Sequence, residues 1–351
     1  MAHEEPVLLS RAGRTARITL NRPRALNALT HAMVRTIDRA LGEWEDDESV
    51  AAVVISGAGE RGLCAGGDIR AIHEDARTGG GASAAFWRDE YRLNARIARY
   101  PKPYVALMDG IVMGGGVGVS AHGSIRIVTE RSAVAMPETG IGLVPDVGGT
   151  YLLSRAPGEL GTHLALTGRA VGAADALLCG LADHFVPSDR LPELSAALAD
   201  TDAGEIAHRY AAAPPEAQLA ADRAWIDTCY AADSVEEIVA RLLDHGGPAA
   251  KEAAATILTR SPTALKATLA ALRLARRTST LERVLDQEYR ASCAALTTAD
   301  LVEGIRAQVI DKDRTPRWSP KELALVTDAE VARFSARPPG GDLGLGDGDR
   351  V

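Results

Sequence analysis

Residues 103–129 read PYVALMDGIVMGGGVGVSAHGSIRIVT, and this stretch decides the fold. The apolar runs 103–108 and 125–129 predict two short strands. Between them, the three glycines from Gly114 to Gly116 mark the start of a helix that we expect to extend through residue 122. A strand, a helix and a second strand in succession are typical of a sheet covered by helices. The stretch therefore predicts an α/β fold.

The flanking sequence extends this pattern toward the N-terminus. Residues 7–10 and 15–21 predict a hairpin, and Thr30 is a suitable N-cap for an amphipathic helix through Trp44. That helix leads to a further strand at 53–56. The first part of the chain is therefore expected to form the layered core.

From about residue 160 onward the strand signals fade. Ser261 and Pro262 predict a helix start, with Ser261 as the N-cap. Helical periodicity recurs in four stretches, which are 191–198, 235–243, 264–274 and 281–296. We expect a core at 1–190, a helical region at 191–335 and a disordered tail at 336–351, which is rich in Gly and Asp.

Composition limits the classes of function. The chain has 351 residues, is 46% hydrophobic and carries a formal net charge of −8, so it can bury a large core and is not expected to bind nucleic acid or a membrane surface. No apolar run approaches the ~18 residues of a membrane span, and no secretory signal is visible. The four cysteines are scattered, which argues against a disulfide framework or a metal site. A cytoplasmic protein without a metal or redox cofactor is expected.

Two glycine-rich turns can supply backbone donors to a ligand. The turn at 64–68 and the turn at 113–118 each follow an apolar run, and glycine lets a ligand approach the backbone closely. The N–H groups of Gly67 and Gly115 are the candidates for an oxyanion hole, which needs two converging donors. Each turn alone could instead be an ordinary tight turn. Neither has the spacing of a phosphate-binding or dinucleotide-binding loop.

Three carboxylates are candidates for acid–base or nucleophilic chemistry. Glu138 follows a proline and is otherwise interpreted as a solvated turn residue. Asp146 also follows a proline and could simply cap the next helix. Glu90 taken alone would be one charge on the solvated face of a helix.

At this point the residues resemble the crotonase superfamily of acyl-CoA enzymes. The resemblance rests on CAGGDI at 64–69, the glycines at 114–116 and PETGIGLVPDVGGT at 137–150, and it spans roughly residues 7 to 334. It implies a ββα spiral core of stacked sheet layers wrapped by helices, a CoA thioester as substrate and frequent homo-oligomers. CoA would enter as part of the substrate, with no separate cofactor.

The superfamily's site residues transfer to this chain by motif position. The two backbone donors become those of Gly67 and Gly115, Glu138 and Asp146 match two acidic catalytic positions, and Glu90 matches a substrate-contacting glutamate. Within the superfamily, the resemblance is to hydrolases of short-chain 3-hydroxyacyl-CoA thioesters. This implies hydrolysis of 3-hydroxyisobutyryl-CoA to 3-hydroxyisobutyrate and CoA, a step of valine catabolism.

Two other functions stay open at the level of sequence. Enoyl-CoA hydratases and isomerases resemble the same scaffold, but hydratases use two glutamates, one of which would fall at Gly118. The missing acid makes hydration the weaker interpretation. A non-catalytic acyl-CoA binder is disfavoured by the paired carboxylates Glu138 and Asp146.

Overall fold

The computed structural model describes residues 5–79, 81–199 and 201–345. The chain divides into two compact units, each assembled from separate segments. Unit 1 contains residues 1–67, 92–135 and 171–218, and unit 2 contains residues 68–91, 136–170 and 219–351. The ranges expected from the sequence, in contrast, are continuous, and their boundaries at 190 and 335 stay predictions.

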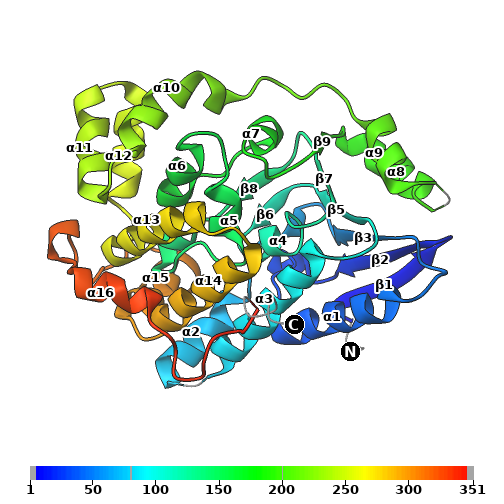
Figure 1. Ribbon diagram of the computed structural model, residues 1–351, viewed down its shortest axis with the longest axis horizontal. Helices are drawn as coiled ribbons and strands as arrows, with labels where there is room; N and C mark the ends of the chain where they lie inside the picture. Colours follow the sequence, from blue (N-terminus) through cyan, green and yellow to red (C-terminus); the bar gives the residue numbers. More distant parts are fainter. Residues whose placement is uncertain (1–4, 80, 200, 346–351) are drawn as a thin grey trace. The chain divides into compact units, whose positions relative to one another are not determined.

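Unit 1 contains both sheets (Figure 1). The larger sheet has the strand order β1-β2-β3-β5-β7-β9, with β1 antiparallel to β2 and every other neighbouring pair parallel. Its strands are β1 (Val7–Ala12), β2 (Thr15–Leu20), β3 (Ala52–Gly57), β5 (Tyr104–Met108), β7 (Ile125–Val128) and β9 (His184–Phe185). The predicted hairpin and strands are confirmed, as is the α/β class.

The helices of unit 1 are interspersed between the strands in sequence. Thr30 caps helix α1 by accepting a hydrogen bond from Met33 N, as predicted. The helices are α1 (His31–Glu45), α4 (Gly115–Gly118), α7 (Ala173–Leu178), α8 (Leu191–Ala197) and α9 (Ala203–Tyr210), with short 3-10 turns η1 (Pro23–Ala25) and η3 (Ser188–Arg190). Helix α3 (Ala82–Ala98) contributes residues to both units.

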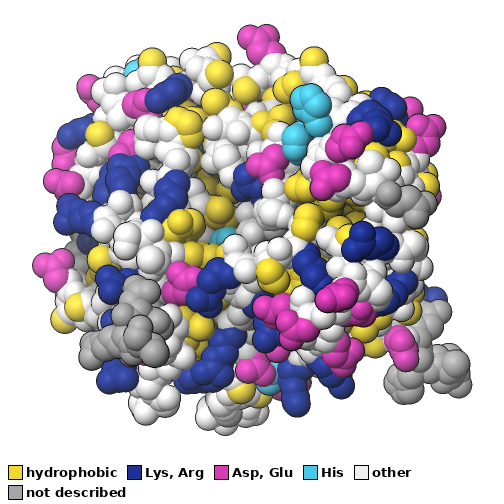
Figure 2. All heavy atoms as spheres, turned by 45° about the vertical axis from the view of Figure 1, so that its right-hand side comes forward, with side chains coloured by type: hydrophobic (Ala, Val, Ile, Leu, Met, Phe, Trp, Pro, Cys, Tyr) yellow, Lys and Arg dark blue, Asp and Glu magenta, His cyan; other side chains and the backbone are white. Residues whose placement is uncertain are grey.

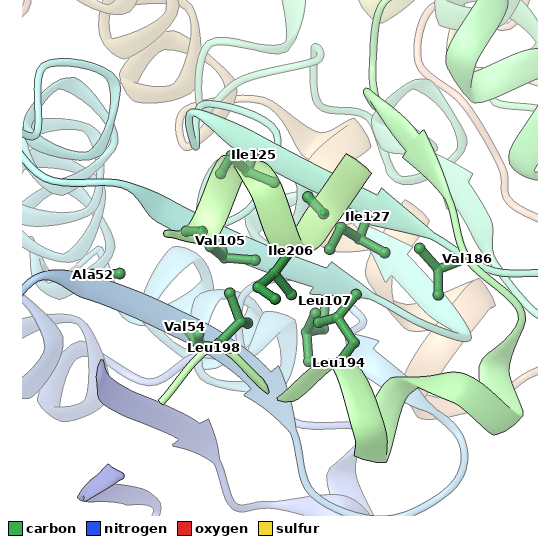
Figure 3. Packing of buried hydrophobic residues seen from close by; sticks show 12 residues of the cluster. Ala52, Val54, Val105, Leu107, Ile125, Ile127, Val186, Leu194, Leu198 and Ile206 are labelled. Atoms are coloured by element: carbon green, nitrogen blue, oxygen red, sulfur yellow. The ribbon is translucent and has the colours of Figure 1, made fainter. Parts of the chain in front are cut away.

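Branched aliphatic side chains fill the space between the larger sheet and helices α8 and α9 (Figure 3). Val105 and Ile127 from the strands are fully buried, as are Leu194 from α8 and Ile206 from α9. Burial of one such side chain contributes about 1.5–3 kcal/mol. The sheet is therefore held against two helices that follow its last strand, β9, in the sequence.

The smaller sheet was not predicted in full. Its three parallel strands, in the order β4-β6-β8, are β4 (Gly62–Cys64), β6 (Ile111–Met113) and β8 (Ala133–Ala135). The helix expected to run through residue 122 ends at Gly118 instead. Three of its four residues are glycine, the poorest helix former after proline, so the helix does not extend.

The described residues of unit 2 form helices joined by loops, and no strand is among them (Figure 1). The helices are α2 (Ile69–Thr78), α5 (Gly149–Leu153), α6 (Leu160–Thr167), α10 (Gln218–Tyr230), α11 (Val235–His245), α12 (Pro248–Ile257), α13 (Pro262–Arg277), α14 (Leu281–Ala295), α15 (Ala299–Ile305) and α16 (Asp328–Ala332). Shorter turns are η2 (Glu138–Ile141), the π-helical η4 (Arg306–Ile310), η5 (Leu323–Leu325) and η6 (Arg333–Ser335). Ser261 caps α13 by accepting from Ala264 N, and the four predicted helical stretches are confirmed.

The described part of the C-terminal segment makes specific contacts. The carboxylate of Asp342 pairs with Arg290 on α14, and Leu343 is buried. Residues 346–351 of the predicted disordered tail lie outside the described residues.

The surface carries mixed charge on the face drawn in Figure 2, where Lys and Arg side chains lie among Asp and Glu side chains. Among the helices that the structure describes, none combines the length and apolar character needed to cross a bilayer.

Candidate active site

The two glycine turns lie side by side in unit 1 because of the smaller sheet. Strands β4 and β6 are parallel neighbours, so their carboxyl ends lie at the same edge. The turn containing Gly67 follows β4, and the turn containing Gly115 follows β6. A Cβ placed on Gly66 would lie 3.7 Å from Gly115 N. The structure therefore brings the two predicted donor turns together.

Glycine is required for this close approach. A Cβ on Gly116 would lie 2.3 Å from the carbonyl oxygen of Cys64, so no side chain fits there. Gly114 has φ +49°, and Gly66 has φ +106°. In the parts of the chain that the structure describes, the N–H groups of Gly67 and Gly115 donate to no backbone acceptor. Both therefore stay candidates for donation to a ligand oxygen.

The three predicted carboxylates are buried in unit 2. Glu138, at the start of η2, is 5% exposed, and its Oε2 has no hydrogen-bond partner in the described residues. Asp146 is 4% exposed. Glu90 on α3 is 2% exposed, and its Oε1 is also without a partner in the described part of the chain. The solvated interpretations of Glu138 and Glu90 are therefore wrong.

Asp146 does not act as a helix cap. The N-cap of α5 is Gly148, and no side chain accepts a hydrogen bond there. The Asp146 carboxylate instead accepts a hydrogen bond from the hydroxyl of Tyr91, with 2.6 Å between Tyr91 Oη and Asp146 Oδ2. Capping, the competing interpretation of this residue, is excluded.

The carboxyl groups share one electrostatic environment. Burial raises the pKa of Asp146 to about 6, although the Tyr91 hydrogen bond lowers it. Burial, together with the negative charge of Asp146, raises the pKa values of Glu138 and Glu90 well above their usual range. A fourth carboxyl, Glu288 on α14, is 1% exposed and has a pKa raised to about 8, chiefly by burial. Perturbed carboxyl groups of this kind are typical of catalytic sites.

Sequence reasoning gave no role to Tyr91 or Glu288. Tyr91 follows Glu90 directly and carries no motif of its own. Glu288 could have been found, because its position falls on the buried face of α14 with Leu281, Val284 and Leu285. An acidic residue on an apolar helix face needs a partner, and that mismatch is the signal.

Among the described residues, no group of three or more His, Cys, Asp or Glu side chains has an arrangement that could hold a metal ion. Carboxyl groups can themselves transfer protons and make polar contacts.

Comparison with known proteins gives the family. A family model for enoyl-CoA hydratase/isomerase matches residues 15–335. A curated relative from Danio rerio, named mitochondrial 3-hydroxyisobutyryl-CoA hydrolase, is 45% identical over 93% of this chain and 88% of its own length. The expected cytoplasmic location is corrected by this comparison, because the relative is a mitochondrial protein by name.

Two solved structures share the whole fold. One, described as a carnitinyl-CoA dehydratase from Mycobacterium thermoresistibile, has a TM-score of 0.94, 53% identity and coverage of 96% of this chain and 98% of its own. Another, described as an enoyl-CoA hydratase from Rhodobacter sphaeroides 2.4.1, has a TM-score of 0.91, 46% identity and coverage of 97% and 99%. The expected crotonase-like fold is confirmed. With a family match over residues 15–335 and relatives of this similarity, the chain belongs to the enoyl-CoA hydratase/isomerase family.

Proposed function

We propose that this protein hydrolyses 3-hydroxyisobutyryl-CoA to 3-hydroxyisobutyrate and CoA, a step of valine catabolism. The observation that carries the proposal is the buried, electrostatically linked pair Glu138 and Asp146. The name of the Danio rerio relative supports the substrate. The proposal makes the protein an acyl-CoA thioester hydrolase, with CoA as part of its substrate.

Stabilisation of the oxyanion is assigned to the backbone. The thioester oxygen gains negative charge as the carbonyl carbon is attacked, and the N–H groups of Gly67 and Gly115 are the donors proposed to bind it. Donors on a rigid backbone need no rearrangement during the reaction. The pairing of β4 with β6 supplies that rigidity.

Glu138 is proposed as the nucleophile or the general base. As a nucleophile it would form an acyl anhydride and expel the CoA thiolate, and water would then open the anhydride. As a base it would remove a proton from the attacking water. Both routes end with the water proton on the CoA thiol and the hydroxyl oxygen in the product acid.

Asp146 is proposed to relay the proton. The raised pKa values of Glu138 and Asp146 mean that the pair keeps a proton to a higher pH than two isolated carboxyl groups would. When Asp146 takes that proton, Glu138 is ionised and can attack or act as a base, and Asp146 can then pass the proton toward the leaving thiolate. Glu90, with an unpartnered Oε1, is proposed to accept a hydrogen bond from the acyl hydroxyl.

Hydration or dehydration of an acyl-CoA is the second candidate, because the two solved relatives are described as a dehydratase and a hydratase. Gly118 argues against it, since an acid of the hydratase pair would fall at this position and glycine has no side chain to supply it.

The two candidates are separated by two assays run side by side. We expect rapid thiol release from 3-hydroxyisobutyryl-CoA and no loss of the double-bond absorbance of crotonyl-CoA. Loss of that absorbance without thiol release would replace the hydrolase assignment with hydration.

A further inference from the structure

The turn that follows Asp146 has an unfavourable backbone conformation. Val147 has φ +54° and Gly148 has φ +81°. Glycine adopts positive φ at little cost, but a β-branched residue such as valine does so only where its surroundings enforce it. Contacts from outside the turn must therefore stabilise its backbone, and this also fixes the direction in which the Asp146 side chain points.

Glu288 from helix α14 holds the backbone of the turn. Its Oε2 accepts a hydrogen bond from Gly148 N at 2.6 Å, and its Oε1 accepts from Thr150 N at 2.9 Å and Thr150 Oγ1 at 2.5 Å. Three donors from two residues of the turn thus converge on one buried carboxyl group. In the sequence, Glu288 is separated from Gly148 by 140 residues and from Thr150 by 138 residues.

Ser292, from the same face of α14, supports the side chain of Asp146 through Tyr91. The hydroxyl oxygens of Tyr91 and Ser292 lie 2.7 Å apart, and Tyr91 Oη lies 2.6 Å from Asp146 Oδ2. Tyrosine has one hydroxyl proton, which it gives to the carboxylate, so Ser292 donates to Tyr91. Glu288 and Ser292 are one helical turn apart on α14, and both are fully buried.

We propose that Glu288, Ser292 and Tyr91 are positioning residues that together fix the Asp146 carboxylate for its part in thioester hydrolysis. This inference rests on the proposed function of Asp146. None of the three needs to touch the substrate: Glu288 fixes the backbone on one side of Asp146, and Tyr91, held by Ser292, fixes its carboxylate.

The surrounding charges explain why such support is needed. Glu90, Glu138 and Glu288 all interact with the negative charge of Asp146, and Tyr91 is the titratable neighbour that donates to it. Whenever one of these carboxyl groups is ionised together with Asp146, the like charges push the Asp146 side chain away from the cluster. A hydrogen bond to an ionised group is among the strongest available, so the Tyr91 hydroxyl can oppose that repulsion.

The first test replaces Tyr91 with phenylalanine. We expect Tyr91→Phe to lower kcat by about 10- to 100-fold, the effect of losing one hydrogen bond to a charged group, with KM changed less than about threefold. Because that hydrogen bond favours ionised Asp146, its loss should move the acid limb of the kcat–pH profile to higher pH by about one unit. Tyr210→Phe, on a half-buried tyrosine of α9 in unit 1, is the matched control and should leave both unchanged.

The second test needs no catalytic turnover. Above about pH 8, where Glu288 itself is ionised, Glu288→Gln keeps an acceptor for Thr150 but turns an amide donor toward Gly148 N. Hydrogen exchange in the peptide spanning residues 143–153 should therefore quicken by about tenfold or more. Glu252→Gln, on an exposed glutamate of α12, is the isosteric control. Ser292→Ala, which keeps Glu288, should shift the pH profile in the direction of Tyr91→Phe, by less.

The outcomes separate this inference from the proposed function. Unchanged kcat, pH profile and exchange in the Tyr91 and Glu288 variants of an active hydrolase would overturn the positioning role and leave the function intact. If the wild-type protein does not hydrolyse the thioester, the proposed function is wrong. Exchange at 143–153 then decides the inference: unchanged exchange in Glu288→Gln overturns it, and faster exchange supports the clamp on the turn.

Discussion

The glycine turns of unit 1 and the carboxyl cluster of unit 2 are built in different ways. The glycine turns meet because each follows a strand of one parallel sheet, and segments close to these strands determine their geometry. The carboxyl cluster is brought together by side chains of α3, η2 and α14. Its contacts join distant parts of the sequence, such as Tyr91 and Ser292, which are 201 residues apart. Local topology thus fixes the proposed donors, whereas long-range packing fixes the proposed acids and bases.

The largest effect is expected from removing the carboxyl groups of unit 2. We expect Glu138→Gln to reduce thiol release from 3-hydroxyisobutyryl-CoA by about 10³-fold or more, because the nucleophile or base is lost. Asp146→Asn should lower the rate of thiol release somewhat less. The double variant should release thiol only slightly more slowly than Glu138→Gln, because the two groups act as a unit. Fully additive losses in steady-state kcat would contradict a shared role.

The proposed donors of unit 1 can be tested separately. Gly115 is the first residue of α4, where the N–H has no partner within the helix, so Gly115→Pro removes one candidate donor. Loss of one oxyanion donor predicts a drop of about 10²–10³-fold in kcat. Gly115→Ala, which keeps the N–H, is the control. Equal activity of the two variants would argue against Gly115 as a donor.

The folding stability is expected to depend on pH through the buried Glu288 of unit 2. Burial raises the pKa of Glu288 from 4.5 to about 8, so the native state holds this proton more tightly than the unfolded state. The resulting stabilisation is present below about pH 4.5 and is lost as pH rises toward 8. Glu288→Gln should therefore flatten the fall of melting temperature between pH 5 and 8. An unchanged slope in thermal melts would count against this assignment.

The smallest expected effect concerns cofactors. We propose that the reaction needs neither a metal nor a redox group, because backbone N–H groups stabilise the oxyanion and carboxyl groups move the proton. Dialysis against a chelator should leave kcat within about twofold, and restored activity on adding a divalent cation would show that a component is missing from this mechanism.

Much of the fold could be predicted from the sequence because its signals are local. The N-caps Thr30 and Ser261, the opening hairpin and the periodic helices all depend on neighbouring residues. Strands β4, β6 and β8 were largely missed because each has only three residues. The end of α4 was missed because the glycines that begin the helix also prevent its extension.

The candidate site divides in the same way. Gly67, Gly115, Glu138, Asp146 and Glu90 were found through motifs, but the burial of the three acids could not be read from their local sequence. Glu288 and Ser292 lie in a helix with no motif of known chemistry, and their partners are more than a hundred residues away. Of these two residues, only Glu288 could have been noticed in the sequence, as an acidic residue on the apolar face of α14.

The most direct test of the account follows the products of 3-hydroxyisobutyryl-CoA in one incubation with the purified protein, separated by chromatography and identified by mass. Hydrolysis predicts 3-hydroxyisobutyrate and free CoA in equal amounts. Conversion to the unsaturated acyl-CoA, with CoA still attached, would contradict the account and identify the protein as a dehydratase.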